Sequence, residues 1–111
     1  MRNLIKKLVR DPTTFTMEDT INLRTLYGNP NWVAPHFYLW ECLQLALTTT
    51  GHILETGSGL STLFLAAGAM HSKTHLTTLE HDPTYYYLTG KLLGDAKTSN
   101  TTLTLAPLAR Y

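Results

Sequence analysis

The stretch that decides the fold is Ile53-Leu54-Glu55-Thr56-Gly57-Ser58-Gly59-Leu60-Ser61-Thr62. The run from His52 to Glu55 predicts a short buried strand, and residues 60–70, which are rich in Leu and Ala, predict a helix. Two glycines in the turn between them let a ligand approach the backbone closely, because no Cβ is in the way. The start of the helix offers free N–H groups to an anionic group, and Ser61 and Thr62 add hydroxyl donors. Turn geometry alone is the alternative reason for these glycines.

The rest of the second half repeats this alternation. Residues 75–79 predict a second strand, and Asp82-Pro83 is a strong helix start, with the acid as cap and the proline in the first position. That helix is expected to run to about Gly94. Residues 101–105 are rich in β-branched Thr and predict a third strand. Strands and helices alternating at these lengths predict parallel strands joined by right-handed crossovers.

The first half of the chain is expected to be helical. Apolar residues recur at helical spacing in residues 4–9, and Asp11-Pro12 ends that pattern. Thr16 is placed to cap a second helix, with Asp19 as the acid of a capping box and Gly28 at the end. A third helix is expected from about Pro35 to the Thr-rich segment 48–50.

Composition and charge narrow the classes of protein. The chain has 111 residues, is 43% hydrophobic and carries a formal net charge of +1, so it predicts one small domain without a nucleic-acid or anionic-membrane partner. Its single cysteine, Cys42, lies in an apolar helical pattern and predicts a buried residue in a reducing compartment. No signal peptide and no apolar segment of about 20 residues is present, so we expect a soluble cytoplasmic protein. No metal site is expected, since His71 and His75 lack further ligands nearby.

Glu80 is the second element of the predicted site. It follows the second strand directly and lies 23 residues after Gly57. An acid at this distance from the turn accepts hydrogen bonds from the ribose hydroxyls of a nucleoside, because a carboxylate offers two acceptor oxygens. The alternative is a solvated acid at a strand end.

Glu55 and Thr62 separate two classes of cofactor. Enzymes that bind dinucleotides use G-x-G-x-x-G, and Thr62 stands where the third glycine would be. A carboxylate at Glu55 repels a pyrophosphate and suits an ammonium group. S-adenosylmethionine carries an ammonium, a sulfonium and a ribose but no phosphate. We therefore favour S-adenosylmethionine over NAD, which leaves a nicotinamide oxidoreductase as the less favoured reading.

The segment Ile53–Leu63, followed by Leu79-Glu80-His81-Asp82, resembles the class I S-adenosylmethionine-dependent methyltransferases. The resemblance runs from about residue 33 to the C-terminus. It implies a three-layer Rossmann-like α/β sandwich, here with a partial parallel sheet of about three strands. Residues 1–50 would form an N-terminal helical extension, and residues 51–111 the N-terminal half of the cofactor-binding domain.

The resemblance also implies a role for each matched residue. The implied cofactor-binding residues are Glu55, Thr56, Gly57, Ser58, Gly59, Ser61, Thr62, Glu80, His81 and Asp82. Glu55 would face the methionine end of the cofactor, with Ser61 and Thr62 near its carboxylate. Glu80 would bind the ribose, with His81 and Asp82 near the adenosine. No catalytic residue is assigned, because methyl transfer can proceed without a protein nucleophile, and no methyl acceptor is identified.

The sequence departs from the family after its third strand. Members continue through a fourth strand that pairs with the free side of the first, whereas this chain ends at Tyr111. The third strand also ends in Ala106-Pro107, where many members place an acid. We expect a fragment with a weakened cofactor site and little independent methyl transfer. The alternatives are a degenerate descendant and a non-catalytic half-domain that pairs with a second copy or a complementing chain through its open sheet edge.

Overall fold

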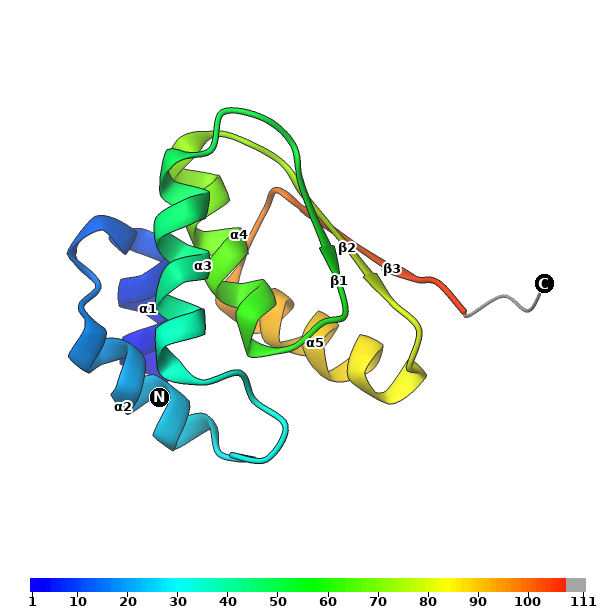
Figure 1. The fold of residues 1–111 in the computed structure, drawn as a ribbon, viewed down its shortest axis with the longest axis horizontal. Helices are drawn as coiled ribbons and strands as arrows, with labels where there is room; N and C mark the ends of the chain where they lie inside the picture. The colour runs from blue at the N-terminus through cyan, green and yellow to red at the C-terminus, as the bar shows by residue number, and fades with distance from the viewer. Residues whose placement is uncertain (108–111) are drawn as a thin grey trace.

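A computed structural model describes residues 1–107, in which helices and strands alternate as Figure 1 shows. The elements are α1 (Arg2–Arg10), a 3-10 turn η1 (Pro12–Thr14), α2 (Met17–Tyr27), α3 (His36–Thr48), β1 (Ile53–Thr56), α4 (Leu60–Ser72), β2 (Leu76–Glu80), α5 (Pro83–Ala96) and β3 (Thr101–Leu105). The three strands are parallel and lie in the order β1-β2-β3. The predicted fold class is confirmed as a mixed α/β fold with an open parallel sheet, consistent with a partial Rossmann-like fold.

Helix α2 begins and ends at residues that cap it. In α2 the Thr16 hydroxyl accepts a hydrogen bond from the Asp19 N–H at 2.9 Å, and the Asp19 carboxylate accepts one from the Thr16 N–H at 3.0 Å. This is the predicted capping box, and it satisfies two N–H groups that the helix leaves free. Gly28 ends the helix with φ +81, a conformation that suits glycine. The Lys7 ammonium also donates to Asp19 at 2.7 Å and so joins α1 to α2.

The three parallel strands pair in a continuous register, so their carboxyl ends lie together at one edge of the sheet. Ile53 lies opposite Leu76 in the first pair of strands, and Glu80 lies opposite Leu105 in the second. Figure 1 shows α4 and α5 beside the sheet and α1–α3 beyond α4, all on the same side. The other face is not covered by residues 1–107, and Leu54 on that face is 65% exposed.

Close packing of α3 against α4 sets the position of α4. A Cβ built on Gly68 would lie 2.5 Å from the Ala46 Cβ and 3.0 Å from the Leu43 carbonyl oxygen. The Ser72 hydroxyl adds a hydrogen bond of 2.8 Å to the Ala46 carbonyl. A side chain with a Cβ at this position would force α3 and α4 apart, so the close approach depends on glycine.

The helices of residues 1–50 share one hydrophobic core with the rest of the molecule. Phe15 and Phe64 meet edge to face at 5.9 Å between ring centroids, joining the turn after α1 to α4. Leu8, Leu23 and Leu43 are fully buried in the same core, and Cys42 is buried as predicted. Within the part of the chain that the structure describes, no helix is both long enough and apolar enough to cross a membrane.

Candidate cofactor site

The turn between β1 and α4 depends on Gly57 for its shape. This residue has φ +82, a conformation that side chains with a Cβ rarely adopt. Its N–H donates to the Leu79 carbonyl at 2.8 Å, so the turn continues the pairing of β1 with β2. Gly59 precedes α4 in an extended conformation, and its N–H donates to the Thr62 hydroxyl at 3.1 Å. Thr56, the last residue of β1, is exposed beside the turn.

Glu80 binds the turn from the end of β2. One of its carboxylate oxygens, Oε1, accepts hydrogen bonds from the Ser58 N–H at 2.8 Å and from the Ser58 hydroxyl at 2.5 Å. The other, Oε2, accepts from the Asp82 N–H at 3.2 Å. The Thr89 hydroxyl of α5 donates to the Ser58 hydroxyl oxygen at 3.0 Å. Ser58 therefore links α5 through the turn to the strand-end carboxylate.

Glu55 lies at the other side of the turn and accepts three hydroxyl hydrogen bonds. Ser61 donates to one carboxylate oxygen at 2.8 Å, while Thr62 and Thr78 donate to the other at 2.6 and 3.0 Å. The side chain is thus held against the first turn of α4 and the middle of β2. The hydroxyls of Ser61 and Thr62 are engaged by Glu55 in this structure.

The two carboxylates have opposite electrostatic environments. Burial raises the pKa of Glu55, and the hydrogen bonds from Thr62, Ser61 and Thr78 only partly offset that effect. Burial also acts to raise the pKa of Glu80, but its hydrogen bonds from Ser58 and Asp82 outweigh burial and hold that pKa below its usual value. The environment therefore favours the charged form of Glu80 and disfavours the charged form of Glu55.

Asp82 and His81 differ in their surroundings. The Asp82 carboxylate caps α5, accepting from the N–H groups of Thr84 at 2.8 Å and Tyr85 at 3.3 Å, as its position before Pro83 predicts. His81 is exposed, and its Nδ1 lies 3.6 Å from a Glu80 oxygen. Asp82 thus has a clear structural role at the edge of the site.

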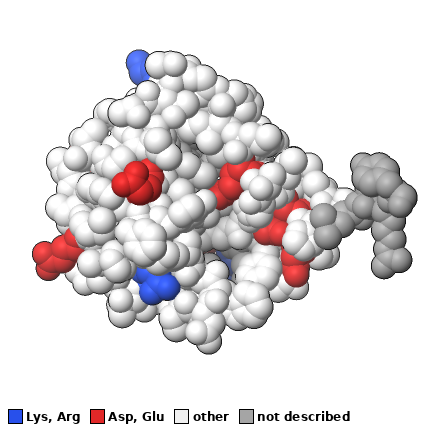
Figure 2. Space-filling model, viewed as in Figure 1, with Lys and Arg blue, Asp and Glu red and all other residues white. Residues whose placement is uncertain are grey.

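The structure brings the predicted residues together at the carboxyl edge of β1 and β2. Figure 2 shows acidic side chains gathered at that edge. Segments 53–62 and 76–85 contain no Lys or Arg, so Glu55, Glu80 and Asp82 dominate the charge there. Such an edge favours a cationic ligand over a phosphate.

Three residues at the site were not predicted from the sequence to lie there: Thr78 and Thr89, which belong to the hydrogen-bond networks, and Cys42, which lies near Glu55. Thr78 lies two residues before Glu80 on the same strand face, so the two-residue period of a strand was a usable signal. Thr89 had no such signal, because it reaches Ser58 from the second turn of α5, which is distant in the sequence. Burial raises the pKa of the Cys42 thiol to about 11, and the nearby charge of Glu55 adds to the effect. That thiol is therefore protonated at neutral pH.

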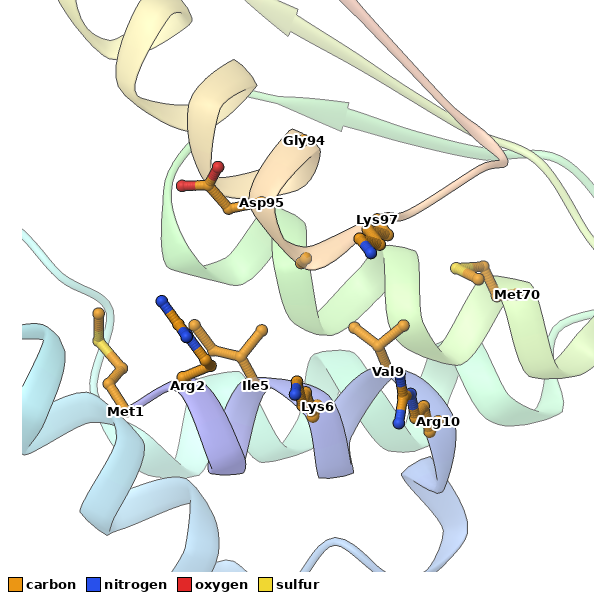
Figure 3. A pocket seen from close by; sticks show the side chains of 11 residues that line it. Met1, Arg2, Ile5, Lys6, Val9, Arg10, Met70, Gly94, Asp95 and Lys97 are labelled. Carbon is orange, nitrogen blue, oxygen red and sulfur yellow. The ribbon is translucent and has the colours of Figure 1, made fainter.

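Two surface hollows lie away from the glycine turn. The larger has a volume of about 940 Å³ and lies between α1 and the C-terminal ends of α4 and α5. Figure 3 shows basic side chains of α1 along this hollow, with Lys97 and Asp95 on its opposite wall. The second hollow is lined by residues including Tyr86, Tyr87 and Leu103. Among residues 1–107, no three metal-ligating side chains gather at either place or at the turn.

Comparisons with protein-family models, with curated proteins and with solved structures found no match for this chain. A functional assignment therefore depends on the residues and the geometry of the edge described above.

Proposed function

We propose that the carboxyl edge of β1 and β2 binds S-adenosylmethionine and that the chain acts in methyl transfer. The observation that carries the proposal is the placement of two carboxylates, Glu55 and Glu80, on either side of a glycine turn that requires φ +82 at Gly57. Such a turn brings a ligand close to the backbone, and the two acids supply its charge preference.

The charges at the edge favour this cofactor over a dinucleotide. Each carboxylate would repel a pyrophosphate within a few ångströms, whereas it would attract the ammonium and sulfonium groups of S-adenosylmethionine. Glu55 suits the methionine end because it lies at the tip of β1, beside the start of α4. Glu80 suits the ribose because it lies at the tip of β2, within hydrogen-bond reach of the turn.

The chemistry asks little of the protein beyond positioning. S-adenosylmethionine supplies a methyl group on a sulfonium, which an acceptor nucleophile attacks in line with the carbon–sulfur bond. The residues of this edge would hold the sulfonium end and the ribose in one orientation, and orientation alone contributes a large part of a rate enhancement. No side chain of the chain has to form a covalent intermediate.

Equilibrium dialysis with radiolabelled S-adenosylmethionine tests the proposal. We expect saturable binding by the unmodified chain and at least about tenfold weaker binding by Glu80→Gln, about 1.4 kcal/mol. Glu41→Gln is the matched control, since Glu41 is an exposed acid on α3 outside the predicted site. The absence of saturable binding, or an equal effect of both substitutions, would contradict the proposal.

The exposed edge of β1 supports a second candidate, a non-catalytic half-domain that pairs with another chain. In residues 1–107, β1 is paired only with β2, and Leu54 is 65% exposed. The N–H groups of Ile53 and Gly57 point to β2, so that of Leu54 points to the free edge. Light scattering coupled to size exclusion tests this candidate: a dimer of the unmodified chain that Leu54→Pro converts to a monomer would support it, and a monomer at all concentrations would refute self-pairing.

A further inference from the structure

The carboxylate of Glu80 is nearly saturated by hydrogen bonds from the protein. A carboxylate has about four acceptor positions, two on each oxygen. Ser58 fills both positions of Oε1, one with its N–H and one with its hydroxyl, and the Asp82 N–H fills one position of Oε2. A single position is left, whereas a ligand with two adjacent hydroxyls needs two.

The hydroxyl of Ser58 is held in place from its other side. The Thr89 hydroxyl donates to it at 3.0 Å, and it donates in turn to Glu80 at 2.5 Å, a short bond typical of a charged acceptor. Thr89 is 2% exposed and Glu80 is 4% exposed, whereas Ser58 is partly exposed, so the two ends of this chain of hydrogen bonds are buried and its middle is not. Bonds in such a chain strengthen one another.

We infer that the Ser58 hydroxyl occupies the acceptor position that one ribose hydroxyl would use, so that a nucleoside binds Glu80 by displacing it. The inference rests on the proposed function of this edge. Rotation of the Ser58 side chain frees one acceptor position of Oε1, while the Ser58 backbone N–H keeps its bond to the same oxygen, so the turn itself stays in place. Ser58 then sets both the affinity for nucleosides and the selectivity for adjacent hydroxyls.

Removal of the competing hydroxyl should strengthen binding. Isothermal titration with adenosine is expected to give about tenfold tighter binding to Ser58→Ala than to the unmodified chain, about 1.4 kcal/mol. The gain should vanish with 2′,3′-dideoxyadenosine, which lacks both hydroxyls. Thr89→Val should give a smaller gain, because it only loosens Ser58. The control Ser99→Ala removes an exposed hydroxyl in the connection from α5 to β3 and should change nothing.

A measurement without ligand reports on the contact itself. Carbon-detected NMR titration should show that Ser58→Ala raises the pKa of Glu80, since a bond that favours the charged form is lost. A pKa that does not move would overturn the inference, as would equal or weaker adenosine binding by Ser58→Ala and Thr89→Val. If the unmodified chain still binds S-adenosylmethionine in that second case, the proposed function stands and only the inference fails. If no variant binds S-adenosylmethionine or adenosine, the proposed function fails and the inference fails with it.

Discussion

Gly68→Ala places one methyl group in the contact between α3 and α4. The new Cβ would lie 2.5 Å from the Ala46 Cβ and 3.0 Å from the Leu43 carbonyl oxygen, so α3 has to move by roughly 1 Å to reach ordinary carbon contact distances. Forced packing of this kind costs about 1–3 kcal/mol, and the upper part of that range, about 2–3 kcal/mol, applies here because the new Cβ also meets the backbone of α3. The better helix propensity of alanine offsets about 1 kcal/mol of this cost. We therefore expect a net loss of about 1–2 kcal/mol in the free energy of unfolding.

Gly94→Ala provides a control with the same chemical change. A Cβ at Gly94 has no heavy atom within 4 Å, so only the propensity gain of about 0.5–1 kcal/mol remains. Urea denaturation followed by circular dichroism measures both variants against the unmodified chain. We expect the free energy of unfolding to fall in Gly68→Ala and to rise in Gly94→Ala. A Gly68→Ala variant as stable as the unmodified chain would refute the view that the contact between α3 and α4 requires glycine at residue 68.

Three further outcomes follow from the site. Burial raises the pKa of Glu55, so the folded chain loses stability as the pH rises through and above 4.5, the usual pKa of a glutamate. In urea titrations over that range, Glu55→Gln should therefore gain stability relative to the unmodified chain. The pKa of Glu80 is lowered, so its stabilisation is present above pH 4.5 and is lost below it; Glu80→Gln should cost about 1.5–3 kcal/mol at pH 7 and progressively less in acid. Gly57→Ala should cost about 1–2 kcal/mol in thermal denaturation because of its positive φ, whereas Gly59→Ala, in extended backbone, should stay within about 0.5 kcal/mol.

The order of helices and strands could be predicted because local signals agree with the pattern of apolar residues. The predicted third strand, residues 101–105, coincides with β3. The first two strands each end one residue later than predicted, since pairing of Thr56 with Leu79 and of Glu80 with Leu105 extends the ladders past the apolar runs. The last helix continues past Gly94 to Ala96, because glycine is tolerated in a helix that Lys97 ends in a left-handed conformation.

The hydrogen-bond partners of the site residues could not be predicted from the sequence. Glycines, acids and hydroxyls near residues 55–62 and 80–82 indicated a site, but which hydroxyl binds which acid depends on how distant segments meet. Thr78 reaches Glu55 only because β1 and β2 pair in one particular register. The demand for glycine at residue 68 arises likewise from a neighbouring helix and has no signature in the local sequence.

The choice of cofactor is the central claim, and calorimetric titration of the unmodified chain with S-adenosylmethionine and with NAD under identical conditions tests it most directly. The acids at Glu55 and Glu80 predict a dissociation constant for S-adenosylmethionine at least about tenfold below that for NAD, a difference of about 1.4 kcal/mol. Tighter binding of NAD, or no binding of S-adenosylmethionine, would contradict it.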